Sequence, residues 1–239
     1  ISTSNCPNKD LYDYGNVFIS ATGTSFYKQC VPDNSIDISF SSTAMHWLTS
    51  APCSIPDALH SSCTCIQDVK DKFRNKGIED MKTILKHRSK ELKKNGWFIL
   101  TNFSIDCNGQ FLGKSEYIEN SMHDVFSSIW KKITTPEIYL ETNFPNQYRT
   151  KEEHLLSIPD NLFLKSYEDK LVRCPFHLRL LNGEYKNSQE YAKDYINTTR
   201  TWSNSTFLSA ALKFVDKNTA KEMVDKLFNE YKQCIINNP

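Results

Sequence analysis

Glycine is scarce in this sequence, with only seven among 239 residues. None of them forms a G-x-G-x-x-G or a G-x-x-x-x-G-K-S/T loop, the two turns that bind dinucleotides and nucleoside triphosphates. If the chain has a nucleotide-binding type of fold, its glycine-rich first turn is therefore not in this sequence.

Neither an excess of charge nor a long apolar run is present. The 29 Lys and Arg residues nearly balance the 28 Asp and Glu residues, for a net charge of +1. A nucleic-acid partner needs a basic face, so we expect none. No apolar run approaches the roughly 20 residues of a membrane-spanning helix, so we also expect no membrane partner. The sequence begins with Ile1 and shows no secretory leader, and we therefore expect a processed product or a piece of a longer protein.

Eight cysteines are present, an even number that is typical of disulfide frameworks in small secreted proteins. This chain is neither small nor dominated by loops, and two of its three Asn-x-Ser/Thr sequons lie in segments expected to be helical. We therefore expect a cytoplasmic protein and keep a secreted, disulfide-linked glycoprotein as an alternative. Cys53, Cys63 and Cys65, with His60 between them, lack the paired C-x2-C spacing of structural zinc sites, so we expect no zinc.

Hydrophobic periodicity predicts a mixed α/β fold. In residues 71–94 apolar side chains recur at helical spacing, and Asn95-Gly96 is typical of a helix stop. Residues 97–104 form a near-continuous apolar strand, of the kind that parallel sheets bury on both faces. The other predicted elements are strands at 16–21, 36–42 and 162–172, a brief helix at 42–48, a capping box at Thr150 and Glu153, and helices at 117–130, 188–212 and 217–236.

An imidazole and an indole are adjacent at His46 and Trp47. Trp is only a hydrogen-bond donor, and a neutral His has one donor and one acceptor. Two such donors in an apolar pocket can hold a carboxylate, and the indole also offers a flat wall to an aromatic substrate. Composition alone favours the alternative, in which both rings fill the core beneath a helix.

The residues around this pair resemble a known family. FISATGTSFYKQCVP at 18–32, followed by SSTAMHWLTSAP at 41–52, resembles the SABATH family of S-adenosylmethionine-dependent carboxyl methyltransferases. The resemblance continues through ILKHRSKELKKNG at 84–96, NFPNQYRTKEEH at 143–154 and VDKLFNEYKQCI at 224–235. The matching residues in the first two stretches are Ser25-Phe26-Tyr27, Pro32, Ser41-Ser42, Trp47-Leu48-Thr49 and Pro52.

Several positions depart from the family's pattern. Phe40, Thr43 and Ala44 differ from the residues common there, so we expect a smaller pocket floor, and Trp97 replaces the second glycine of a G-G pair. The family's N-terminal segment, with its glycine-rich cofactor turn and the acidic residue that holds the ribose, is not in this sequence.

The resemblance implies a fold and its division. We expect the C-terminal part of a Rossmann-like methyltransferase sheet with an α-helical cap. Residues 1–112 would be the remainder of the α/β core, 113–160 the helical cap, 161–187 a strand region of the core, and 188–239 helices that complete cap and core. The family also implies a possible homodimer.

The same resemblance implies the chemistry. The methyl group of S-adenosylmethionine would move by in-line displacement to the carboxylate of a small aromatic or apolar acid. A carboxylic acid with a pKa of about 4 is already ionised at neutral pH, so no catalytic base is expected and alignment is the main requirement. Ser25 and Phe26 would contact the cofactor, and His46, Trp47 and Tyr148 would contact the substrate.

Two further expectations complete this interpretation. Some family members show a metal near the N-x-P turn, but Leu140 stands where an acidic residue is expected before Asn143, so we expect no metal. Because the glycine-rich turn is missing, we keep an alternative, in which the chain is a non-catalytic relative of the family that acts as an interaction protein.

Overall fold

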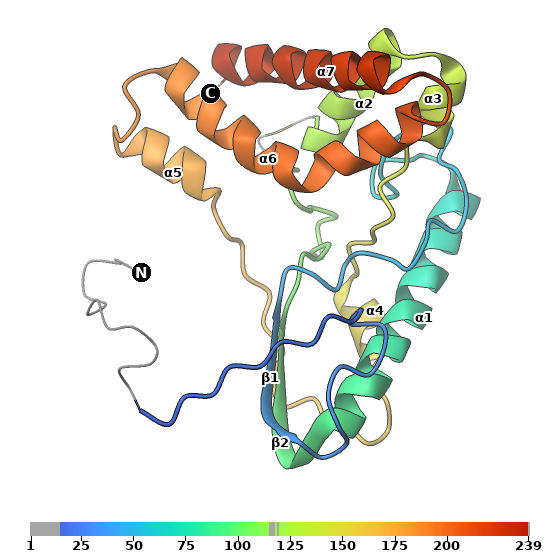
Figure 1. The fold of residues 1–239 in the computed structure, drawn as a ribbon, viewed down its shortest axis with the longest axis vertical. Coiled ribbons are helices and arrows are strands. Elements are labelled where there is room, and N and C mark those ends of the chain that lie inside the picture. The colour runs from blue at the N-terminus through green and yellow to red at the C-terminus, as the bar shows by residue number, and fades with distance from the viewer. Residues whose placement is uncertain (1–14, 115–117, 119, 239) are drawn as a thin grey trace.

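The computed structural model describes residues 15–114, 118 and 120–238. Cys6 and Tyr117, the first residue of the predicted helix 117–130, lie outside these residues. The elements confirm a mixed α/β fold, with the strands beside α1 and α4 and most other helices in a separate layer (Figure 1). They are β1 (Ile36–Ser42), α1 (Gln67–Glu91), β2 (Leu92–Thr101), α2 (Met122–Ile133), α3 (Pro136–Glu141), α4 (Lys151–Leu155), α5 (Pro175–Leu181), α6 (Ser188–Ala211) and α7 (Lys217–Asn237).

A β-α-β unit forms the α/β part. The strands β1 and β2 pair in parallel, with Ile38 opposite Trp97 and Phe40 opposite Ile99. Parallel neighbours need a long crossover, which α1 provides. The inner face of β2 packs on α1 through Phe98 and Leu100. These two side chains contact a cluster of buried residues, Met45, Met81, Ile84 and Leu85.

The expected helix stop at Asn95-Gly96 was wrong. The helix α1 already ends at Glu91, and β2 begins at the next residue. Asn95 has a φ of 66° and lies with Gly96 in an irregular stretch of β2, where the pairing register shifts. A Cβ atom on Gly96 would lie 3.0 Å from the carbonyl oxygen of Ile36, so the glycine permits this close approach.

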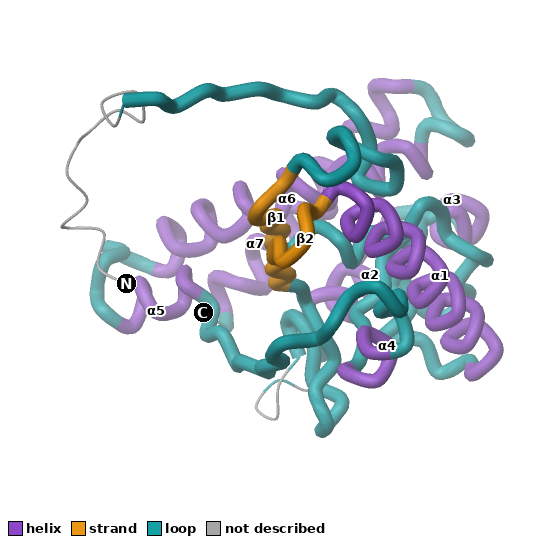
Figure 2. Tube along the Cα trace, turned by 90° about the horizontal axis from the view of Figure 1, so that it is seen from below, coloured by secondary structure: helices purple, strands orange, loops and turns teal. Residues whose placement is uncertain are grey.

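The outer face of the sheet is apolar and open. Ile38, Phe40, Trp97 and Ile99 are 65%, 65%, 52% and 47% exposed. In Figure 2 the helix α1 lies beside one face of the two strands, and among the described residues α1 is the one helix with several contacts to β2. The prediction that residues 97–104 are buried on both faces was therefore wrong for this face.

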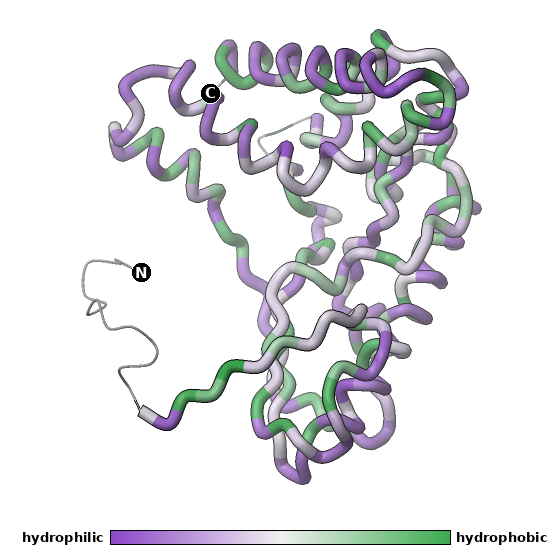
Figure 3. The backbone as a smooth tube through the Cα atoms, in the orientation of Figure 1, coloured by the Kyte–Doolittle hydropathy of each residue, from purple (hydrophilic) through white to green (hydrophobic). Residues whose placement is uncertain are grey.

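Two predicted strands do not form. Residues 16–21 are irregular, and Phe18 is 94% exposed within an apolar stretch that is visible in Figure 3. Residues 162–172 are likewise without regular structure, and Phe163 and Leu171 are exposed. Both predictions came from apolar composition, but a strand also needs a neighbouring strand to satisfy its backbone groups. No such neighbour is present for either segment within the described residues.

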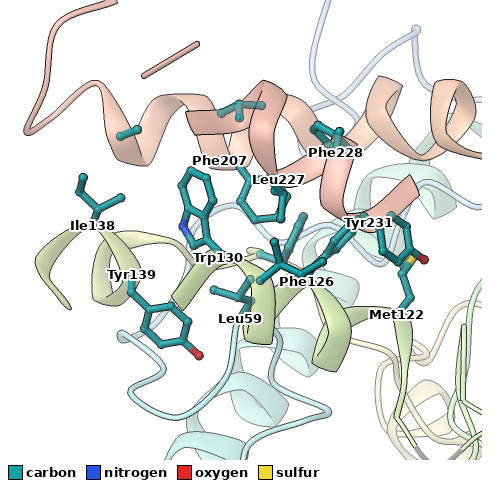
Figure 4. Packing of buried hydrophobic residues seen from close by; sticks show 14 of the residues in the cluster. Leu59, Met122, Phe126, Trp130, Ile138, Tyr139, Phe207, Leu227, Phe228 and Tyr231 are labelled. Carbon is teal, nitrogen blue, oxygen red and sulfur yellow. The ribbon is translucent and has the colours of Figure 1, made fainter. Parts of the chain in front are cut away.

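The largest core lies in the helical layer, where α2 packs against α6 and α7 (Figure 4). Phe126 of α2 meets Phe207 of α6 edge-on at a centroid distance of 5.5 Å, and the indole of Trp130 donates to Thr142 Oγ1 at 2.8 Å. The predicted helices 188–212 and 217–236 are confirmed, each to within one residue. No helix among the described residues is both long and apolar enough to cross a bilayer.

The open sheet face generates a stability prediction. Phe40→Thr should change the free energy of unfolding by less than about 0.5 kcal/mol, because the ring is already largely in water and Thr keeps the strand preference. Phe98→Thr, on the opposite face, should cost about 2 kcal/mol because it removes packing on α1. Urea unfolding of both variants measures this difference. Equal costs would mean that the outer face is covered.

Candidate functional site

A short segment, residues 145–149, aligns the parts of the candidate site. On one side the backbone N–H of Gln147 donates to the carbonyl of His46 at 2.9 Å, and Trp47 and Asn146 form an antiparallel bridge. On the other side the N–H of Ile105, just beyond β2, donates to the Arg149 carbonyl at 3.2 Å. The segment therefore joins the His46–Trp47 pair to the end of the sheet, and we call it the 145–149 segment.

The pair itself lies in a turn, so the brief helix predicted at 42–48 was wrong. The turn closes with a hydrogen bond from the Trp47 N–H to the Ala44 carbonyl at 3.3 Å. Thr43 enters it with a positive φ of 49°, a conformation that does not continue a helix. The rings of His46 and Trp47 remain neighbours, with centroids 5.8 Å apart.

His46 is buried among aromatic rings. Its Nδ1 lies 3.2 Å from Asn102 Oδ1, and the rings of Phe103 and Tyr148 lie 5.1 and 5.8 Å from it. Burial, with a smaller contribution from the charge of Arg149, lowers the pKa of His46 to about 4 despite the hydrogen bond with Asn102. The imidazole is therefore neutral at pH 7 and carries one N–H.

Trp47 faces different surroundings. Its indole packs at the edge of the helical-layer core and lines a groove of about 610 Å³. Ser205, Thr206 and Ser209 of α6 also line the groove. Lys213 and Glu141 pair at the same groove. The two neighbouring rings thus lie at different sites, His46 among buried aromatic rings and Trp47 at an open groove.

His60 and His123 form a stacked pair next to Tyr148, and nothing in the sequence predicted a functional role for this pair. His60 and His123 stack with centroids 4.3 Å apart, and His123 Nε2 lies 3.2 Å from the hydroxyl of Tyr148. His60 Nδ1 accepts from the N–H of Ser62 at 3.0 Å, so its proton is on Nε2, which faces Asn146. Residues 60, 123 and 148 share no local motif, and only the fold brings them together.

Burial sets the charge of this histidine pair. It lowers the pKa of His123 to about 3 and the pKa of His60 well below its usual value. Tyr148, expected to contact the substrate, is buried against both rings, and burial raises its pKa. These three side chains are uncharged at neutral pH.

The residues expected to contact a cofactor lie next to the same turn. Ser25 is exposed and Phe26 is half-buried at the edge of the Met45 cluster. The neighbouring Tyr27 hydroxyl donates to the carbonyl of Trp47, which links the two turns directly. Arg88 of α1 donates to the Phe26 carbonyl at 3.0 Å and so holds this segment from the helix side.

Arg149, at the end of the 145–149 segment, is fully buried. Its Nε donates to the carbonyl of Gly77 in α1 at 2.9 Å, and its Nη1 donates to the carbonyl of Met45 at 2.8 Å. A Cβ atom on residue 77 would lie 2.8 Å from Gln147 Cγ, so glycine allows the segment to pass this close to the helix. Burial lowers the pKa of Arg149 to about 10, which leaves the guanidinium charged at neutral pH.

Cys63 and His60, two of the residues considered above as zinc ligands, lie near this site and have other partners. Cys63 Sγ lies 3.3 Å from Ser121 Oγ, and His60 is engaged with Asn146 and Ser62. The described residues contain no group of three His, Cys, Asp or Glu side chains arranged to hold a metal ion. Their seven cysteines are all free.

Comparison with known proteins identifies similar chains. A family described as SAM-dependent carboxyl methyltransferase matches residues 2–238. Among solved structures, one described as loganic acid methyltransferase with SAH aligns with a TM-score of 0.65 at 16% sequence identity. The alignment covers 97% of this chain and 63% of that one, so this chain spans less than two thirds of the length of its structural neighbour. At this identity the likeness shows the fold.

The buried histidines predict acid sensitivity. In the unfolded chain His46, His60 and His123 take up protons near pH 6.5. In the folded chain burial lowers the pKa of His46 to about 4 and that of His123 to about 3, and it lowers the pKa of His60 well below its usual value. Stability should therefore be unaffected above about pH 7 and should fall as pH drops below 6.5. Burial also lowers the pKa of His154 to about 4, and near pH 5 the four histidines together predict a loss of about 5 kcal/mol per pH unit.

Urea unfolding at several pH values measures this slope. His123→Gln, which keeps a polar group near Tyr148, should reduce the slope by about 1.4 kcal/mol per pH unit. Phe126→Leu, a core variant that removes no titrating group, should lower stability at every pH without changing the slope. An unchanged slope in His123→Gln would contradict the prediction.

Proposed function

Because the chain belongs to the S-adenosylmethionine-dependent carboxyl methyltransferase family, we propose that it methylates the carboxylate of a small acid. The observation that carries the proposal is the His46–Trp47 turn, held by the 145–149 segment beside the Ser25–Tyr27 turn. The turn expected to contact a cofactor and the turn expected to contact a carboxylate are thus neighbours.

The residues expected to hold S-adenosylmethionine fit that role. Phe26 is half-buried, so part of its ring remains free to pack on an adenine, and the Ser25 hydroxyl is exposed. Arg88 and the Tyr27–Trp47 hydrogen bond hold this turn in place. When bound, S-adenosylmethionine supplies an electrophilic methyl group. The structural neighbour was solved with SAH, which supports this cofactor.

The residues at the turn are suited to holding a carboxylate rather than to moving protons. An ionised carboxylate needs no base, and the His46 imidazole, with its pKa lowered to about 4, does not act as a base of ordinary strength. The task of the chain is to orient the carboxylate by hydrogen bonds and to keep water away from it. The surrounding rings of Phe103 and Tyr148 supply the apolar environment that strengthens such hydrogen bonds.

The orientation of the Asn102 amide decides which nitrogen of the His46 ring carries the proton and can donate a hydrogen bond. With Oδ1 toward Nδ1, the single proton of the neutral ring is on Nδ1, and Nε2 has only a lone pair. With the amide rotated, its N–H₂ donates to Nδ1 and Nε2–H becomes free to donate to a carboxylate oxygen. The Asn102 Nδ2 atom has no partner among the described residues in the first arrangement. We infer that the second arrangement accompanies carboxylate binding.

The substrate is proposed to be a small acid with an apolar or aromatic body. Phe103, Tyr148 and the indole of Trp47 favour such a body. The hydroxyls of α6 along the groove beside Trp47 favour additional polar groups at its distal end. A cytoplasmic location is supported by the cysteines of the described residues, all seven of which are free, as a reducing compartment favours.

The open apolar sheet face supports a second candidate function, that of a non-catalytic interaction protein. Clustered exposed apolar side chains such as Phe40 and Trp97 are typical of surfaces that contact another polypeptide. Calorimetry with S-adenosylmethionine separates the two candidates, because the interaction protein should release no heat at millimolar ligand.

Substitution at the turn tests the proposed site. Trp47→Ala should weaken binding of benzoate, used as a simple aromatic acid, by at least about tenfold, because it removes a hydrogen bond to a charged group. It should leave S-adenosylmethionine binding within about twofold. Phe26→Ala should give the opposite pattern. Calorimetry with both ligands measures this, with Trp97→Ala, an exposed Trp on the sheet face, as the matched control. Unchanged benzoate binding in Trp47→Ala would contradict the assignment.

The tautomer of His46 gives an independent check. In the complex with benzoate at pH 7, we expect the proton on Nε2, because only that tautomer donates to the carboxylate while accepting from the Asn102 amide. Nitrogen-15 NMR of histidine-labelled protein distinguishes the tautomers. A proton on Nδ1 in the complex would exclude His46 as a carboxylate donor.

A further inference from the structure

Arg149 combines complete burial with an unpaired positive charge. Among the described residues no carboxylate lies within 4 Å of its guanidinium, and its Nη2 has no hydrogen-bond partner. A buried charge is costly unless it is paired. A neutral side chain of similar size would satisfy ordinary packing at lower cost, so the charge calls for an explanation.

The nearest acidic groups are engaged elsewhere. Asp80 of α1 accepts from the N–H of Thr49 at 2.8 Å and pairs with Lys76 at 3.0 Å. Glu153 pairs with Arg74 at 3.1 Å and completes the capping box at the start of α4. Both carboxylates favour the charged form of Arg149 from a distance, but neither forms an ion pair with it.

The direct partners of Arg149 are main-chain carbonyls on either side of the candidate site. Nε binds the Gly77 carbonyl in α1, and Nη1 binds the Met45 carbonyl. The Met45 carbonyl belongs to the peptide group that carries the N–H of His46. The guanidinium fork therefore fixes the start of the His46–Trp47 turn against the helix, and it places a full positive charge next to the His46 backbone.

We propose that Arg149 is a positioning residue of the carboxylate site. Its fork holds the His46–Trp47 turn in register with α1, and its unpaired charge makes the site prefer an anion over a neutral ligand of the same shape. This inference rests on the proposed carboxylate-binding function. The missing counter-charge is then supplied by the substrate.

The field of Arg149 reaches the imidazole of His46. The positive charge lowers the pKa of His46, and it also lowers the pKa of His154 in α4. The other titratable and charged groups around Arg149 and His46 in the described part of the chain include Tyr27, Asp80 of α1, Glu153 of α4, Tyr148 and the neutral His60. Arg149 is the cation in that set. Its removal should therefore change how strongly the site prefers an anion over a neutral ligand.

A series of variants that changes the local charge tests the proposal. Arg149→Met removes the charge, Arg149→Lys keeps the charge but not the fork, and Glu153→Gln removes an opposing charge while preserving the capping box, which accepts Gln. Affinities for benzoate and for its neutral methyl ester are measured with each variant, and the benzoate-to-ester preference is compared. Arg179→Met, at an exposed position of α5, is the matched control.

We expect the preference for benzoate to fall about tenfold in Arg149→Met, which corresponds to about 1.4 kcal/mol. It should stay within about twofold of the unsubstituted protein in Arg149→Lys and rise about threefold in Glu153→Gln. A purely structural role would weaken both ligands equally and leave the preference unchanged, and that result would overturn the proposal. If Arg149→Met does not fold, the other two variants decide by the same comparison.

A second readout separates this inference from the proposed function. Nuclear magnetic resonance follows the protonation of the His46 imidazole, which should begin at a higher pH in Arg149→Met than in Arg149→Lys. If the unsubstituted protein binds neither benzoate nor S-adenosylmethionine, the methyltransferase proposal fails, while the His46 titration still tests the influence of Arg149. Identical His46 titrations in the two folded variants would overturn the inference.

Discussion

The arrangement of the candidate site depends on one interaction, the hydrogen bonds from the Arg149 guanidinium to carbonyls of α1 and of the turn before His46. These bonds fix the distance between the helix that backs the sheet and the loop that carries the two adjacent rings. The planar fork of an arginine suits this task, since its donors point in set directions from a rigid group. Gly77 is part of the same constraint, because a larger residue there would meet Gln147.

Neutral, buried polar rings surround this anchor. His46, His60 and His123 are all held uncharged by burial, and each has at least one polar contact that orients its ring. Such a site differs from an acid–base centre, where at least one group keeps a pKa near the working pH. The chemistry that fits it is recognition of a charge that the ligand brings, in surroundings of low polarity where each hydrogen bond counts for more.

Local signals in the sequence predicted the local features well. The helical spacing of 188–212 and 217–236 and the capping box of Thr150 and Glu153 are confirmed, because each depends on residues only a few positions apart. The parallel arrangement of the strands that flank α1 also followed from their order along the chain. The family resemblance, carried by short stretches around Phe26 and Trp47, agrees with the family match to residues 2–238.

Features that depend on contacts between residues far apart in the sequence could not be predicted from the sequence. The segments 16–21 and 162–172 are apolar enough for strands, but whether a strand forms depends on a neighbour that composition does not reveal. The stack of His60 on His123 joins a loop to a helix 63 positions away, and no local sequence motif predicts this contact. The burial of Arg149 is equally invisible, because an arginine in a polar turn ordinarily faces water.

The bond between Arg149 and Met45 spans 104 residues of sequence. Closing so long a loop has an entropic cost that no single hydrogen bond offsets, so the contact exists only once the intervening strands and helices have folded. The proposed carboxylate site therefore forms only together with the cooperative folding of the segments that it joins. If the turn binds a carboxylate as proposed, the ligand would stabilise the fold by mass action, and we expect isolated peptides that contain His46 and Trp47 to bind none.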